Sequence, residues 1–130
     1  MLVVDASVAV AASHSPIGLA RLASHKLVAP YLMAAEAGSV LHEKVWRQEI
    51  TPERGRIMLA RLARSPVELL APDGLLEEAW AVADELGWAK TYDAHYVALA
   101  RLLRCRLVTV DERLLHGIAR LGIAVRPRDI

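Results

Sequence analysis

Two short apolar runs constrain the fold of this chain more than any other feature, because each ends in an aspartate where a helical pattern begins. Residues 2–4 lead into Asp5 and an alanine-rich segment, and residues 107–110 lead into Asp111. Apolar runs of this length are too short for helices and are predicted to be buried strands. Ligands of open α/β sheets bind beyond the carboxyl ends of the strands. The two strands are therefore expected to deliver two carboxylates to one edge of a shared sheet.

Strand and helix patterns alternate along the chain. The expected strands are residues 2–5, 27–29, 67–70, 106–110 and 123–125. The expected helices are residues 6–12, 15–25, 31–48, 51–64, 75–86, 92–103 and 111–121. N-cap residues begin three of these helices and glycines end two of them, namely Ser15, Thr51, Thr91, Gly87 and Gly122. Alternation of this kind predicts an α/β protein with a parallel sheet and helices on both faces.

Length and composition fit a single domain covering residues 1–130. A chain of 130 residues can bury most of its apolar surface in one core. The single cysteine, Cys105, cannot form an internal disulfide, so a reduced, cytoplasmic protein is expected. The longest charge-free stretch, residues 6–20, is interrupted by Pro16 and Gly18 and is shorter than the roughly 20 apolar residues of a spanning helix. No membrane segment is expected.

Two further acids are isolated from other charges. Glu36 is the only charged residue between positions 26 and 43, and Asp93 is the only one between positions 90 and 101. Glu36 is expected on the core-facing stripe of its helix, together with Leu32 and Val40, where an unpaired carboxylate would be costly to bury. The other acids have simpler explanations: Asp5 and Asp111 as helix N-caps, each contributing about 1 kcal/mol, and Asp93 as a first-turn acid.

No lysine or arginine lies three or four positions from Glu36, so its compensation must come from elsewhere in the fold. A divalent ion shared with the strand-end acids would supply it. Carboxylates without interleaved His or Cys favour Mg²⁺ or Mn²⁺, and such a cluster hydrolyses phosphodiesters by activating water and stabilising the leaving oxygen. The hydroxyls of Ser7 and Thr109 are expected near the same edge, either orienting a water or phosphate oxygen or capping local backbone.

Four segments, residues 3–7, 30–36, 91–100 and 107–114, resemble in order the motifs of the PIN-domain nucleases, most closely the compact VapC toxins of VapBC toxin–antitoxin modules. The resemblance covers nearly the whole chain. It implies a three-layer α/β/α sandwich with a central, mainly parallel sheet, a metal-dependent endoribonuclease acting on RNA, a cognate VapB-like antitoxin that covers the groove, and a homodimer. It also implies a Mg²⁺ or Mn²⁺ site with supporting hydroxyls, formed by Asp5, Glu36, Asp93, Asp111, Ser7 and Thr109.

Two positions qualify the resemblance. The family often has Asn three residues after its second acid, where this chain has Ser39. Glu112 is a possible additional ligand, although a solvent-facing first-turn acid is the simpler interpretation.

RNA would need positive charge beside the acids, but the net charge is only +1. Some arginines are candidates for phosphate contact, with a solvated helix face as the alternative: Arg54, Arg61, Arg64, Arg126 and Arg128.

Three other classes of protein share features with this chain. A haloacid-dehalogenase-like phosphatase needs a second aspartate two residues after the first, and Ser7 stands there. A receiver domain needs paired N-terminal acids and a phosphoacceptor aspartate after a strand, whereas Asp73 lies in a Pro–Asp–Gly turn. A catalytically silent PIN-like module that acts only through a protein partner stays open as the alternative function.

Overall fold

The computed structural model describes residues 1–130 and contains one five-stranded sheet in the order β3-β2-β1-β4-β5. Every neighbouring pair of strands is parallel. The strands are β1 (Leu2–Val4), β2 (Leu27–Pro30), β3 (Glu68–Leu70), β4 (Arg106–Val108) and β5 (Ala124–Val125). The predicted parallel sheet is confirmed, and the N-terminal strand lies at its centre.

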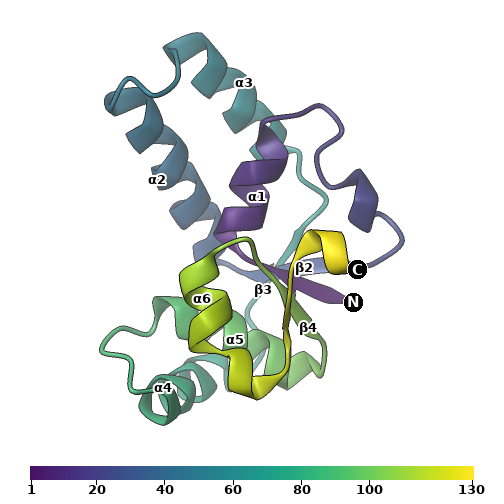
Figure 1. Cartoon of the computed structure of the whole chain (residues 1–130), viewed down its shortest axis with the longest axis vertical. Helices are drawn as coiled ribbons and strands as arrows, with labels where there is room; N and C mark the ends of the chain where they lie inside the picture. Colours follow the sequence, from purple (N-terminus) through teal and green to yellow (C-terminus); the bar gives the residue numbers. More distant parts are fainter.

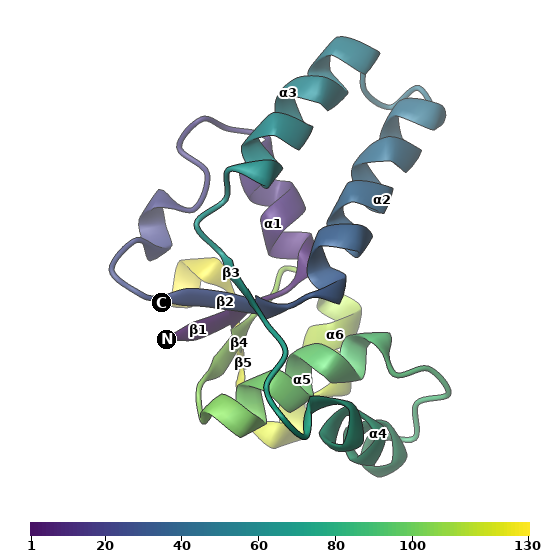
Figure 2. The ribbon, with the colours of Figure 1, turned by 180° about the vertical axis from the view of Figure 1, so that it is seen from behind.

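Helices cover both faces of the sheet, so the predicted three-layer α/β/α sandwich is confirmed (Figure 1). The helices are α1 (Ala6–Ser13), α2 (Leu32–Trp46), α3 (Pro52–Ala63), α4 (Leu75–Leu86), α5 (Tyr92–Leu103) and α6 (Glu112–Gly117). Helices α1, α2 and α3 lie on one side of the strands, and α4, α5 and α6 lie on the other (Figure 2). A continuous core of 29 buried hydrophobic residues fills the space between the layers. No helix has both the length and the apolar character needed to cross a membrane.

The register of the central strands decides where the first candidate acid lies. Val4 of β1 pairs with Val108 of β4, and the Asp5 amide donates to the Val108 carbonyl at 3.2 Å. The residues that follow the two strands are Asp5 and Thr109, and both are buried. Parallel pairing thus brings two polar side chains from distant parts of the sequence to the same edge of the sheet.

The helix expected over residues 15–25 is wrong. This segment forms bends and turns with a single 3₁₀ turn at Ala20–Leu22. The Ser15 hydroxyl accepts the Ile17 amide at 3.2 Å, which closes a local turn instead of capping a helix. Gly18 then adopts a positive φ of 56°, a conformation that breaks a right-handed helix.

Two other predicted boundaries need correction near the sheet edge. Strand β4 ends at Val108 rather than at residue 110, because the Val110 amide donates to Ser7 Oγ instead of to another strand. Helix α6 ends at Gly117, and a separate 3₁₀ turn, Ala119–Leu121, follows it. Thr91 precedes α5 as expected but makes no side-chain cap, and its carbonyl accepts the His95 amide instead.

The core-facing stripe of α2 also differs from the prediction. Its buried residues are Met33, Ala37 and Leu41. Glu36 and Leu32 are only partly buried, and Val40 is exposed. The observed buried stripe lies one position after the predicted one. One residue of an α-helix corresponds to a rotation of about 100°, so Glu36 points away from the core by about that angle. That rotation directs the carboxylate into a groove rather than into the hydrophobic core.

Candidate active site at the carboxyl edge of the sheet

A groove of about 460 Å³ lies at this edge, lined by α1, α2, α5 and the segment that joins β4 to α6. It collects acids from four separate parts of the sequence, Asp5, Glu36, Asp93 and Asp111. A larger hollow of about 750 Å³ lies between α1, α3 and the segment after α1, but Glu68 is the only acid in its lining. Of these two hollows, only the groove gathers the predicted carboxylates.

Asp5 is the most enclosed of the four acids, with 4% of its surface exposed. Its Oδ1 accepts the Ser7 hydroxyl at 2.6 Å and the Val8 amide at 3.1 Å, so it is the N-cap of α1. Its Oδ2 accepts the Thr109 hydroxyl at 2.5 Å. Burial raises the pKa of Asp5, while the hydrogen bonds from Ser7 and Thr109 act to lower it.

The orientations of the Ser7 and Thr109 hydroxyls follow from their second partners. Ser7 Oγ accepts the Val110 amide at 3.1 Å, and Thr109 Oγ1 accepts the Asp111 amide at 3.0 Å. Each hydroxyl therefore donates its proton to Asp5 and accepts an amide from the segment after β4. Both side chains hold Asp5 and this segment together, which ties the first strand-end acid to the second.

Glu36 faces the groove with a partly buried side chain. Its Oε1 is buried without a hydrogen-bond partner, as is the hydroxyl of Tyr96. Burial raises the pKa of Glu36 to about 7, and the charges of Asp93 and Asp5 add to this rise, while the nearby Tyr96 hydroxyl opposes it. Burial beside Glu36 also raises the pKa of Tyr96. Burying a carboxylate oxygen without a partner is energetically unfavourable. This oxygen is therefore the atom of the site that is free to coordinate a metal ion.

Asp93 and Asp111 share one cation. Arg113 Nη2 lies 2.9 Å from Asp93 Oδ2 and 3.7 Å from Asp111 Oδ2. Asp111 Oδ1 also accepts the Arg113 amide at 2.9 Å and the Leu114 amide at 3.3 Å, so Asp111 is the N-cap of α6. The capping interpretation of Asp5 and Asp111 is therefore geometrically correct, and each capping residue also lines the groove.

The donor set of this groove suits a hard divalent ion. The groove lining contains four carboxylates, one histidine and no cysteine, a chemistry that favours Mg²⁺ or Mn²⁺ over Zn²⁺. The unpartnered Oε1 of Glu36 is the kind of atom that an ion would satisfy. In this conformation no three acid, histidine or cysteine side chains are close enough together to hold one ion, and two of the acids face Arg113 instead.

The two positions that qualified the resemblance, Glu112 and Ser39, lie outside the groove lining. Glu112 is exposed, and its Oε2 pairs with Arg126 Nη2 at 2.8 Å. This hydrogen-bonded pair lowers the pKa of Glu112. Ser39 is exposed on α2. Neither residue takes part in the hydrogen-bond network around Asp5.

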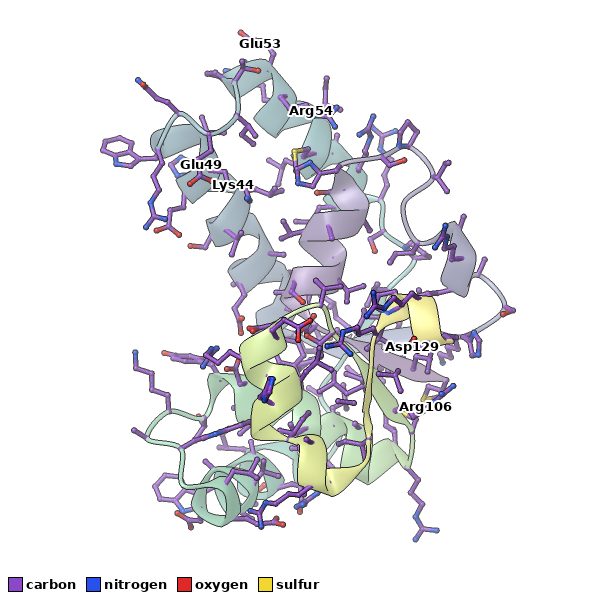
Figure 3. All side chains as sticks on the ribbon, viewed as in Figure 1. Lys44, Glu49, Glu53, Arg54, Arg106 and Asp129 are labelled. Atoms are coloured by element: carbon purple, nitrogen blue, oxygen red, sulfur yellow. The ribbon has the colours of Figure 1, made fainter.

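Several predicted phosphate-binding arginines are engaged elsewhere. Arg54 Nη2 donates to the His14 carbonyl, and Arg61 Nη1 donates to the Ser13 carbonyl at 3.2 Å. Figure 3 shows Arg54 on α3 beside the end of α1. Cationic side chains at the carbonyl end of a helix are favourable. These two arginines therefore hold α3 against α1 instead of serving the groove.

Sequence reasoning missed four polar residues of the groove, namely Tyr96, Lys44, Arg113 and His14. Spacing was the available signal for the first two, because Tyr96 lies three positions after Asp93 and Lys44 lies eight positions after Glu36, which places each pair on one helix face. Figure 3 shows Lys44 near Glu49 at the far end of α2, and the two side chains are 3.7 Å apart. Arg113 had no comparable local signal.

The fold and the groove define a class of α/β/α proteins with carboxylates gathered at the carboxyl edge of a parallel sheet. A family model described as the PIN domain matches residues 2–121. VapC ribonuclease Mb0985 of Mycobacterium bovis and Ribonuclease VapC9 of Mycobacterium tuberculosis are each 40% identical to this chain over 131 residues. Each alignment covers 98% of this chain and 100% of the relative.

The fold has a counterpart among solved structures. The crystal structure of PAE2754 from Pyrobaculum aerophilum superposes with a TM-score of 0.76 at 25% identity, covering 98% of this chain and 90% of that chain. Sequence and fold therefore agree. The chain belongs to the PIN-domain family and, within it, to the VapC ribonucleases.

Proposed function

We propose that this protein is a Mg²⁺- or Mn²⁺-dependent endoribonuclease and the toxin of a type II toxin–antitoxin pair. The observation that carries the proposal is the Glu36 carboxylate, because its buried Oε1 has no partner and the residue lines a groove with three more acids. The names of the relatives, which call them ribonucleases, indicate RNA as the substrate.

The proposed metal ligands are Asp5, Glu36, Asp93 and Asp111. When bound, the ion would activate a water and stabilise the leaving oxygen of the phosphodiester. The residues of this chain would supply the positioning. Ser7 and Thr109 each donate to Asp5 and would keep its carboxylate fixed in one orientation. Burial raises the pKa of Glu36 to about 7, so at neutral pH binding of the ion would release the proton from those Glu36 side chains that carry one.

We further propose that residues 1–130 form a single nuclease domain that acts in the cytoplasm as a homodimer and is inhibited by a VapB-like antitoxin. One continuous core of 29 buried residues supports the single domain. Family membership supports the antitoxin. Large exposed side chains, including Leu76 and Trp80 on α4, provide apolar surface that a second copy could cover.

The direct test is cleavage of a panel of single-stranded RNAs with added Mn²⁺ or Mg²⁺, comparing the wild type with Asp93→Asn and Asp5→Asn. We expect cleavage by the wild type, inhibition by chelator, and loss of at least about 100-fold in rate in each variant. Circular dichroism must show both variants folded. Asp73→Asn, in an exposed turn away from the groove, is the matched control and should cleave normally. Cleavage retained in both groove variants would contradict the proposal and favour the silent binding module.

A further inference from the structure

Arg113 is the one arginine in the lining of the groove. It lies in the first turn of α6, two residues after Asp111. A single guanidinium nitrogen, Nη2, reaches the carboxylate of Asp93 at 2.9 Å and that of Asp111 at 3.7 Å. These two acids come from different elements, α5 and the N-cap of α6. Arg113 therefore bridges half of the proposed metal ligands.

Other arginines with named partners differ from Arg113 because those partners lie outside the acid set. Arg54 and Arg61 donate to carbonyls at the end of α1. Arg101 pairs with Glu78 and Glu85 between α4 and α5, and Arg126 pairs with Glu112. Arg113 alone neutralises acids to which we assign a functional role. Its contact is specific to the site and is not a general feature of the surface.

The contact has the properties of an exchangeable ion pair. The Arg113 side chain is 77% exposed, while those of Asp93 and Asp111 are 31% and 34% exposed. Exposed ion pairs add little stability and are screened by salt, so the guanidinium can leave at small cost. A divalent ion bound to the same carboxylates would repel the guanidinium. It would also satisfy Glu36, which Arg113 does not contact.

We propose that Arg113 alternates between two partners. Without a bound ion, the Arg113 guanidinium neutralises Asp93 and Asp111. When the ion binds these carboxylates, the guanidinium instead contacts a phosphate of the RNA. This inference rests on the function proposed above and adds a substrate-binding residue to it. The planar guanidinium matches the geometry of a phosphate. Its place at the mouth of the groove, two residues from the Asp111 cap, leaves it within reach of a strand that crosses the acids.

The first half of the proposal is tested by calorimetric titration with Mn²⁺ in the absence of RNA. Because the ion must displace Arg113, we expect Arg113→Ala to bind Mn²⁺ about two- to fivefold more tightly than the wild type. Lys44→Ala is the matched control, since Lys44 lines the same groove and carries the same charge but pairs with Glu49 at 3.7 Å. The Mn²⁺ affinity of Lys44→Ala should change by less than about twofold.

The second half is tested by binding of a fluorescein-labelled, phosphorothioate-linked single-stranded RNA over a range of salt concentrations. With Mn²⁺ present, the slope of log affinity against log salt should be smaller in Arg113→Ala than in the wild type by about 0.7, the value for one phosphate contact on a single strand. With chelator present the two slopes should agree, because the guanidinium is then held by the acids. Arg106→Ala, exposed at the start of β4 and so at the opposite end of the strands from the groove, controls for a distant loss of charge.

The outcomes separate this inference from the proposed function. Equal Mn²⁺ affinity in the wild type and Arg113→Ala, or an equal gain in Lys44→Ala, would overturn the exchange. If the slope of log RNA affinity against log salt does not differ between the wild type and Arg113→Ala when Mn²⁺ is present, the phosphate contact is overturned. A wild type that binds Mn²⁺ but cleaves no RNA would contradict the proposed function while leaving the exchange measurable. A wild type that binds no divalent ion would overturn both.

Discussion

Asp5 combines two roles in one carboxylate. As the N-cap of α1 it accepts the Val8 amide, and as a wall of the groove it is held by two hydroxyls. Capping and function are often treated as competing explanations for an acid at the start of a helix. Here the same geometry would serve both the cap and the proposed metal site, because a cap fixes the carboxylate at the carboxyl end of β1, where the groove lies.

Thr109 is the residue whose single hydroxyl most directly stabilises Asp5. We expect Thr109→Val, which keeps the shape and removes the hydroxyl, to lower the free energy of unfolding by about 1.5–3 kcal/mol, because a buried carboxylate loses its 2.5 Å donor. Thr109→Ser keeps the hydroxyl and should cost much less. Urea unfolding with a constant m-value is the measurement. Equal losses in the two variants would mean that packing, not the hydrogen bond, matters at this position.

Glu36 makes the stability of the protein depend on pH. Its folded pKa of about 7 lies above the ordinary value of 4.5, so the folded state holds the proton more tightly and stability falls as pH rises from about 4.5 to about 7. Above that window the loss is complete. The side chain is only partly buried, so solvent screening limits the loss to about 1–2 kcal/mol.

Glu36→Gln isolates this effect because its amide does not titrate in that range. In chelator, the variant should gain stability relative to the wild type as pH rises from about 5 to about 8, by the same 1–2 kcal/mol. Ser39→Ala, at an exposed and non-titrating position on the same helix, is the control and should show no such trend. A pH-independent difference between Glu36→Gln and the wild type would show that the Glu36 pKa is near normal.

At the scale of elements, helix α2 contacts the core with one face and lines the groove with another. Met33, Ala37 and Leu41 face the core, while Glu36, Val40 and Lys44 line the groove. The far end of the helix packs on α3 through Gly55, which is buried. These contacts hold the helix in the rotation that directs Glu36 toward the other acids.

The two glycines of this helix pair give opposite predictions. A Cβ at Gly55 would lie 2.5 Å from Val45 Cγ2, whereas a Cβ at Gly38 would have no neighbour within 4 Å. Gly55→Ala should therefore destabilise the protein by about 1–3 kcal/mol through overpacking, and Gly38→Ala should stabilise it by about 0.5–1 kcal/mol through helix propensity. Thermal unfolding compares the two variants. A stabilising Gly55→Ala would mean that α2 and α3 separate easily.

At the scale of the whole molecule, the proposed metal binding would be linked to folding. An ion that binds only the folded state stabilises it by about 1.4 kcal/mol for each tenfold excess of free ion over the dissociation constant. Wild-type protein should therefore show a thermal midpoint that rises steadily with Mn²⁺, and Asp93→Asn should lose most of that rise. Differential scanning calorimetry with and without chelator measures it. A midpoint independent of Mn²⁺ and Mg²⁺ would argue against a carboxylate metal site.

Much of the fold and the candidate acids followed from local sequence patterns. Strand ends, helix periodicity and caps involve residues only a few positions apart, so the sequence alone was enough to place Asp5 and Asp111 at a sheet edge. The same reasoning failed for residues 15–25, where Gly18 and the Ser15 turn outweighed an N-cap and proline signal. It also misjudged the rotation of α2 by one residue.

The sequence by itself determined the parallel α/β architecture and the four candidate acids, because both depend on short-range periodicity and on composition. Only the tertiary structure decided how the charged groups pair. It directs Arg54 and Arg61 to the end of α1, Arg113 to Asp93 and Asp111, and leaves Glu36 Oε1 without a partner. Ion pairs and burial depend on distances between residues far apart in the chain, and local patterns carry no information about those distances.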